Sequence, residues 1–248
     1  MWLIPIRPDI NYAVKELSRT MKQPTVTCQS KLRQLLRYLK GTLDYRYDLT
    51  PRITSVGSPT TDVVAFVDSD WAGCKTTRKS TSGGVIQILG TTVHHFSRTQ
   101  ATIATSSAEA ELYAIGTGVA EAISITHFLE ESKLATKTQL IAKTDSTSAK
   151  AIAGRLGLSK QTKHIQPRYL YMQDLTQSGL LRMEKVHTSQ NPADTLTKYL
   201  PAYVLSFHLE NLGIKSLTYV MEPDDQVTVA QVYRFYATRP EKTWKTRE

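Results

Sequence analysis

Cysteine is scarce in this chain: Cys28 and Cys74 are the only two in 248 residues, and they do not form a Cys-x-x-Cys pair. A structural zinc site needs a cluster of Cys or His ligands, and a disulfide framework needs several paired cysteines. Neither is indicated here. Unpaired cysteines are typical of a reducing compartment, so we expect an intracellular protein.

Long apolar runs are also missing. The opening segment MWLIPIRPDI is interrupted by two prolines and an arginine before the apolar part of an export signal could form. No apolar run approaches the roughly 18 residues that a membrane-spanning helix needs. We therefore expect neither an export signal nor a membrane partner.

Positive charge, by contrast, is abundant: 31 Lys and Arg face 22 Asp and Glu, a formal net charge of +9. The excess is uneven, because residues 1–60 carry ten Lys or Arg against four Asp or Glu, a net charge of +6. Basic side chains that neutralise phosphates release counterions from a polyanion. The charge therefore favours a nucleic-acid partner, although a solvated basic surface would have the same composition.

The periodicity of apolar residues divides the chain into four parts. Residues 1–50 carry two helical patterns, over 9–22 and from Thr27 to Gly41, and 51–62 have the Pro, Gly, Ser and Thr content of a linker. Residues 63–212 form the main domain, and 213–248 give only weak signals. Within the main domain we expect strands at 63–68, 84–89 and 92–97, a helix of about 27 residues from Ser107, a strand at 139–144, a helix at 147–155, a helical stretch ending near Gly179, a strand at 181–187 and a final helix after Asn191.

This order of elements predicts an α/β fold. Strands 63–68, 84–89 and 92–97 are separated by short turns and should pair antiparallel. The later strands alternate with helices and should pair parallel through right-handed crossovers. The result is a mixed five-stranded sheet flanked by helices.

Four acidic residues lie at the edges of these segments: Asp68, Glu111, Asp145 and Asp194. Each has a structural interpretation of its own. Asp68 could be a turn residue, and Asp70 leaves the same strand face. Asp145 could cap the following helix, and Asp194 sits in a first helical turn, where the helix dipole favours an acid.

Glu109 and Glu111 can be distinguished. Ser106 and Glu109 have the S-x-x-E spacing of a capping box, so Glu109 is expected to serve the helix start. Glu111 is in phase with Ile115 and Leu129 on the apolar stripe. A carboxylate beside a buried face needs a partner, which could be a metal ion or a basic side chain.

The expected topology brings all four acids to one side of the sheet. Clustered carboxylates repel one another unless cations neutralise them, and oxygen ligands select Mg²⁺ or Mn²⁺ over zinc. Two such ions about 3.5 to 4 Å apart can hydrolyse a phosphodiester.

Several motifs resemble one known family. They are VDSDWAGCKTTRKSTSG, TSSAEAELYAI, TDSTSAKAI, TKHIQPRYLYMQDL and NPADTLTKYLP. Together they resemble the ribonuclease H domain of Ty1/copia-type retrotransposon Pol polyproteins, over roughly residues 63–212. Upstream, RPDINYAVKELSRTMKQPT and LRYLKGTLDY are similar to the segment that joins the reverse transcriptase to that domain.

The resemblance implies a ribonuclease H-like fold and a Mg²⁺-dependent endonuclease that cuts the RNA strand of RNA/DNA hybrids. It further implies two Mg²⁺ ions, replaceable by Mn²⁺, and a location in the cytoplasm, within a virus-like particle, or in the nucleus. The reverse transcriptase region of the same polyprotein would be a partner. The family's four metal-binding and catalytic acids fall on Asp68, Glu111, Asp145 and Asp194.

Nucleic-acid contacts are also implied. Ser106 and Ser107 stand where related nucleases touch the minor groove of the hybrid. Lys160, Lys163, His164 and Arg168 form a basic cluster that could contact phosphates or could be a solvated helix start. His187 ends a strand near the position of a loop histidine that assists product release in relatives, but the loop is shorter here, so a polar strand end is favoured.

Two other functions stay open. The chain could be a catalytically silent remnant that binds nucleic acid through its N-terminal basic helices, or an integrase-like member of the same broad fold, for which the last helix offers only Glu210. No Tyr-x-Asp-Asp polymerase motif occurs, so the chain cannot be a working reverse transcriptase by itself.

Overall fold

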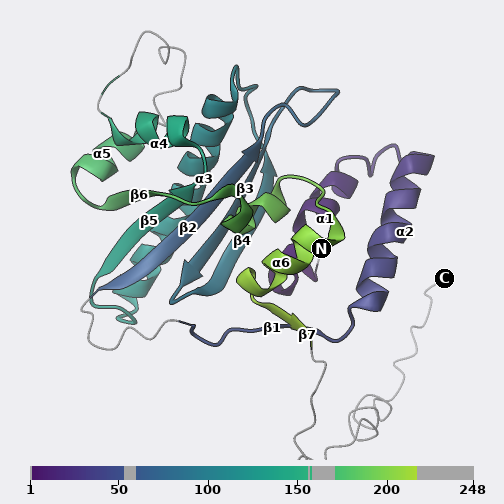
Figure 1. Ribbon diagram of the computed structural model, residues 1–248, viewed down its shortest axis with the longest axis horizontal. Helices are drawn as coiled ribbons and strands as arrows, with labels where there is room; N and C mark the ends of the chain where they lie inside the picture. The colour runs from purple at the N-terminus through teal and green to yellow at the C-terminus, as the bar shows by residue number, and fades with distance from the viewer. Residues whose placement is uncertain (1, 53–59, 156, 158–170, 217–248) are drawn as a thin grey trace, which may run out of the picture. The chain divides into compact units, whose positions relative to one another are not determined.

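A mixed five-stranded sheet forms the centre of the computed structural model, which describes residues 2–52, 60–155, 157 and 171–216 (Figure 1). Its strands are β2 (Thr61–Asp70), β3 (Thr81–Ile88), β4 (Thr91–Thr99), β5 (Thr138–Thr144) and β6 (Leu181–Lys185). They are ordered β4-β3-β2-β5-β6. β3 pairs antiparallel with β2 and β4, and β5 pairs parallel with β2 and β6. The predicted α/β class with a mixed five-stranded sheet is confirmed.

Both faces of β2 are covered, and its sequence shows how. Val63, Ala65 and Val67 alternate along the strand and are fully buried in the larger core, against the long helix α3 (Ser107–Glu131). Phe66 points to the opposite face and packs in a second core around Val85. Because successive strand residues leave opposite faces, VVAFVD supplies apolar side chains to both layers and ends in an acid.

The first face carries α3, α4 (Thr147–Gly154) and α5 (Tyr171–Gln177). α3 begins at Ser107 as predicted. Its length and composition would also allow it to cross a membrane, so the expectation that no segment is long and apolar enough was wrong. In the structure 56% of the apolar window of α3 is buried, and the helix packs on β2, β3 and β5.

The second face carries two separate elements where one final helix was predicted. The 3-10 helix η5 (Pro192–Leu196) follows Asn191, and α6 (Ala202–Asn211) begins only after Pro201. The single-helix prediction was wrong because proline lacks an amide hydrogen and disfavours a helical conformation in the residue before it. β7 (Ile214–Ser216) then pairs antiparallel with β1 (Tyr45–Tyr47), two short strands that were not predicted.

The N-terminal segment packs on the sheet within the same compact unit, which spans Met1–Ser216. It comprises 3-10 turns at Ile4–Ile6 and Pro8–Ile10, then α1 (Asn11–Ser18) and α2 (Val26–Gly41). Asn11 Nδ2 lies 3.0 Å from His95 Nδ1 of β4, and Lys15 Nζ donates to Thr81 Oγ1 of β3 at 2.6 Å.

Several boundaries differ from the sequence prediction. α2 is capped by Thr25, whose side chain accepts a hydrogen bond from the Cys28 amide, and not by Thr27. Thr25 is the residue with extended backbone dihedrals, as an N-cap requires, whereas Thr27 already lies inside the helix. β2 begins at Thr61, within the segment read as a linker, and β7 lies in the segment read as a tail.

Candidate active site

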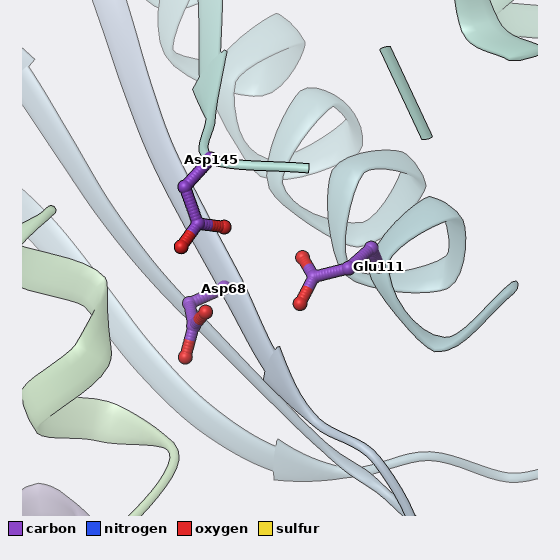
Figure 2. Close-up of side chains that lie close together, drawn as sticks. All are labelled: Asp68, Glu111 and Asp145. Carbon is purple, nitrogen blue, oxygen red and sulfur yellow. The ribbon is translucent and has the colours of Figure 1, made fainter. Parts of the chain in front are cut away.

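Three of the four predicted acids converge at the ends of the parallel strands. Asp68 comes from β2, Asp145 follows the last residue of β5, and Glu111 stands in the second turn of α3. One carboxylate oxygen of each lies within 4.8 Å of the others. Figure 2 shows the three side chains directed into one common space. Residues 43 and 34 positions apart along the chain thus form one oxygen-lined cluster.

Asp68 is the buried member of the cluster, with 4% of its surface exposed. Burial raises the pKa of Asp68 well above its ordinary value, and the charges of Glu111 and Asp194 raise it further. Thr197 Oγ1 donates a hydrogen bond to Asp68 Oδ2. The other strand acid, Asp70, accepts instead from the Thr81 amide and does not belong to the cluster of three.

Only one of the two carboxylate oxygens of Glu111 accepts hydrogen bonds from the described residues. Ser69 donates to Glu111 Oε1 through its amide at 3.2 Å and its hydroxyl at 3.1 Å. Glu111 Oε2 is buried and has no hydrogen-bond partner among the described residues. Burial and the charge of Asp145 raise the pKa of Glu111 to about 7. Among the described residues, no Lys or Arg forms an ion pair with Glu111. Of the two partners predicted for this carboxylate, a metal ion or a basic side chain, the described residues therefore do not supply the second.

The N-cap of α4 is Ser146 and not Asp145. Ser146 is the N-cap of α4, and its side chain accepts a hydrogen bond from the Ala149 amide at 3.1 Å. Helix capping therefore does not explain the acid at position 145. Its half-buried carboxylate faces Asp68 and Glu111 (Figure 2).

Asp194 lies beside this cluster but outside the group of three. It is buried in η5, where Asn191 caps the helix by accepting from the Ala193 amide at 3.2 Å. Lys198 Nζ donates to Asp194 Oδ1 at 2.7 Å. Burial alone would lower the pKa of Lys198, but its hydrogen bond to Asp194 and the charges of Asp194 and Asp68 raise it.

Sequence reasoning missed the groups that hold the acids in place. Thr197 and Lys198 follow Asp194 in the TLTK segment, and Ser69 follows Asp68. Asn191, the cap of η5, also donates through Nδ2 to the Val67 carbonyl at 2.9 Å, which ties η5 to β2 one residue before Asp68. Lys198 follows Asp194 by four residues, the spacing of an ion pair along a helix, so that contact could have been proposed from the sequence. For Ser69 and Thr197 the only signal was adjacency to a candidate acid or its segment, because their contacts join segments far apart in the chain.

The remaining predicted residues are placed as follows. Ser106 is the N-cap of α3, accepting from the Glu109 amide at 3.2 Å, and Ser107 is the first residue of that helix; both are exposed. Glu109 accepts from the Thr105 amide at 2.7 Å, in keeping with its predicted role at the helix start. His187 caps the 3-10 helix Thr188–Gln190. Lys160, Lys163, His164 and Arg168 lie outside the described residues.

The donor set of this cluster suits a hard divalent cation. All three groups are carboxylates, and ions such as Mg²⁺ take oxygen ligands. The orphaned Oε2 of Glu111 and the mutual repulsion of the acids are the conditions that a bound cation relieves. The cluster can therefore hold a metal ion.

Comparison with known proteins identifies relatives over most of the chain. The chain is 30% identical over 214 residues to the retrovirus-related Pol polyprotein from transposon TNT 1-94 of Nicotiana tabacum, a match covering 86% of the chain and 16% of that protein. It is also 30% identical over 208 residues to the Pol polyprotein from transposon RE1 of Arabidopsis thaliana, covering 84% and 14%. The chain is a homologue of retrovirus-related Pol polyproteins.

This homologue corresponds to about one seventh of the length of those Pol polyproteins, and the resemblance of its motifs to Pol polyproteins is confirmed. No protein-family model matches it. Among solved structures it is similar to the N-terminal RNase H domain of a Mycobacterium tuberculosis protein, solved as a fusion with maltose-binding protein. That match has a TM-score of 0.41 and 16% sequence identity, and covers 60% of this chain and 97% of the other.

Proposed function

We propose that this Pol homologue is a metal-dependent endonuclease that hydrolyses the RNA strand of RNA/DNA hybrids. The observation that carries the proposal is the carboxylate cluster, in which Glu111 Oε2 is buried without a described partner while Asp68 and Asp145 face it. The motif resemblance gives the substrate class, and the basic N-terminal segment suits a polyanion. The chain has no polymerase motif, so the proposal is confined to nuclease chemistry.

Divalent cations would be held by Asp68, Glu111 and Asp145, with Asp194 at the edge of the site. When bound, two Mg²⁺ or Mn²⁺ ions would activate a water and stabilise the leaving oxygen of the phosphodiester, giving a 3′-hydroxyl and a 5′-phosphate. The chain's own residues prepare this site. Ser69 fixes one oxygen of Glu111, and Thr197 fixes one oxygen of Asp68.

Lys198 has a distinct part in the proposed site. Its ammonium group neutralises Asp194, which reduces the repulsion that Asp194 exerts on Asp68. It would also keep a positive charge beside the position of an incoming phosphate.

The decisive experiment removes one carboxylate without changing its size. Asp145→Asn should lower Mg²⁺-dependent cleavage of a labelled RNA/DNA hybrid on the order of 100-fold or more, since it deletes a charged ligand from the site. RNA duplex, DNA duplex and a chelator serve as substrate and metal controls. Asp174→Asn, an exposed acid on α5, should leave cleavage unchanged.

The outcomes separate this proposal from its rivals. Equal cleavage by the native chain and Asp145→Asn would show that the site is assigned wrongly. Hybrid binding without cleavage in Mg²⁺ and in Mn²⁺ would favour a catalytically silent nucleic-acid-binding remnant. Strand transfer on DNA ends would favour the integrase-like alternative.

A further inference from the structure

A groove next to the candidate active site is lined by residues of α1, α2, α6 and the loop before α6. Figure 1 shows how these helices are arranged. It has a volume of about 550 Å³. Its lining is mainly apolar but includes four tyrosines, Tyr12, Tyr38, Tyr45 and Tyr199. A space of this size is in the range of pockets that hold small ligands, so it could hold one or two flat groups but not a duplex.

Two of the tyrosines form an aromatic surface with cations around it. The rings of Tyr12 and Tyr199 meet edge to face with centroids 4.9 Å apart. Lys31 Nζ lies 5.4 Å from the centre of the Tyr199 ring, and Lys15 Nζ lies 5.1 Å from that of Tyr12. Tyr199 is nevertheless 54% exposed. Tyr38, in contrast, is committed to the fold, because its hydroxyl donates to Asp9.

The charge around the groove is mostly positive, although Lys15, the cation beside Tyr12, is itself paired with Glu16 at 2.6 Å. α2, which forms one wall, carries four basic residues and no acid. The acid in the lining, Asp9, is neutralised by Arg7 at 2.7 Å. Lys198 lines the groove and also binds Asp194, which lies beside the carboxylate cluster. The groove is therefore adjacent to the candidate active site.

We propose that this groove binds a single-stranded segment of nucleic acid that extends from the hybrid at the active site, with an unpaired base against Tyr199 and the backbone near Lys31. Exposed aromatic rings beside basic side chains are the combination that single-strand-binding proteins use, since every base has a face that can stack. The inference rests on the proposed function for the identity of the duplex but concerns a different surface.

The test measures binding, so that it does not depend on cleavage. In chelator, fluorescence anisotropy would compare a blunt RNA/DNA hybrid with the same hybrid carrying a short single-stranded DNA overhang. The native chain should bind the overhang form about tenfold more tightly, the gain expected from one stacked base. Tyr199→Ala should lose this preference while keeping its affinity for the blunt hybrid, and Tyr199→Phe should retain it.

Matched variants complete the design. Tyr203→Ala removes a tyrosine of α6 that is 78% exposed and does not line the groove, and it should keep the preference. Lys31→Gln should weaken overhang binding and reduce the slope of log affinity against log salt by about 0.7, the value for one contact to a single strand. Thermal unfolding of each variant verifies its fold.

The inference is overturned if the native chain binds both hybrids equally, or if Tyr199→Ala and Tyr203→Ala behave alike. Cleavage is scored separately in Mg²⁺. A chain that never cuts the hybrid but keeps the Tyr199-dependent preference refutes the proposed function and supports the groove. A chain that cuts the hybrid but does not prefer the overhang form supports the proposed function and refutes the proposed role of the groove.

Discussion

At the scale of single residues, the site is a balance between repulsion and the groups that hold it together. Four acids, three of them in one cluster, share a small region with one lysine. Asp68 has a donor in Thr197 and Glu111 has donors in Ser69, but Glu111 Oε2 has none among the described residues. Without metal, the ionised Glu111 side chain should therefore destabilise the folded state, to an extent that depends on pH.

The sign of this dependence follows from the pKa of Glu111, which burial and Asp145 raise to about 7 from an ordinary 4.5. The folded state holds the proton more tightly than the unfolded chain, so the resulting stability is complete below about pH 4.5 and is lost as pH rises through 7. The loss from this group should be on the order of 2 kcal/mol.

Glu111→Gln cannot ionise and should remove that loss. In chelator at about pH 8, the variant should be more stable than the native chain by on the order of 2 kcal/mol, and the two should converge at low pH. Urea unfolding at several pH values measures this. Glu131→Gln, an exposed residue at the end of the same helix, is the control. Parallel pH curves for the native chain and Glu111→Gln would contradict the prediction.

At the scale of elements, one glycine allows η5 to approach the sheet. Gly83 of β3 is paired with Asp68 of β2. A Cβ atom added at Gly83 would lie 2.7 Å from Thr197 Cγ2, 2.9 Å from the Ala193 carbonyl oxygen and 2.9 Å from Leu196 Cβ. The Ala193 carbonyl oxygen belongs to the backbone, and Leu196 Cβ is bonded directly to it. Rotation of a side chain therefore cannot relieve these two contacts. The absence of a Cβ at Gly83 thus permits the packing that places Asp194 and Thr197.

Gly83→Ala should force η5 away from the sheet. We expect a loss of about 1 to 3 kcal/mol of stability, typical of an overpacked core. Divalent-cation binding, followed by calorimetry, should weaken because Thr197 moves away from Asp68. Gly154→Ala adds a methyl group at the end of α4 where no atom lies within 4 Å, and it should change neither property. Unaltered cation binding in Gly83→Ala would show that η5 does not position the site.

The secondary-structure elements differ in how well the sequence predicts them. The β-strands and α3 have clear apolar periods, and the Ser106 cap marks where α3 begins. The four acids could be proposed from their places at element edges. The break at Pro201 was missed because the apolar pattern of the last helix hid it, and β1 and β7 have only three residues each, too few to show a period. The contact of Thr197 with Asp68 depends on how η5 packs against the sheet, which no local pattern predicts.

At the scale of the whole molecule, the basic N-terminal segment is part of the folded unit, not a separate appendage. Arg7 binds Asp9 and the Thr42 side chain, so the segment has its own buried ion pair. Its contacts with the sheet include those of Asn11 with the buried His95 and of Lys15 with Thr81. Because α1 and α2 also form one wall of the groove, the position of this segment controls the proposed binding surface.

His95 should make this packing sensitive to acid. Burial lowers its pKa to about 4, although hydrogen bonds with the backbone of Pro5 and Ile4 oppose the shift. The folded state binds the proton more weakly than the unfolded chain, so the associated stability is present above about pH 6.5 and is lost as pH falls towards 4. This trend is opposite to that of Glu111, and because the two pH ranges overlap, the two contributions to stability partly cancel.

His95→Gln should flatten the acid side of the stability curve. The native chain should lose on the order of 2 kcal/mol between about pH 6.5 and pH 4 from this group, and the variant should not. His187→Gln, an exposed histidine on the opposite edge strand's loop, should behave like the native chain. Urea unfolding gives the stabilities, and the overhang preference measured at about pH 5 tests whether the groove changes with the packing. If His95→Gln loses stability in acid as steeply as the native chain, then His95 does not couple the N-terminal segment to the sheet.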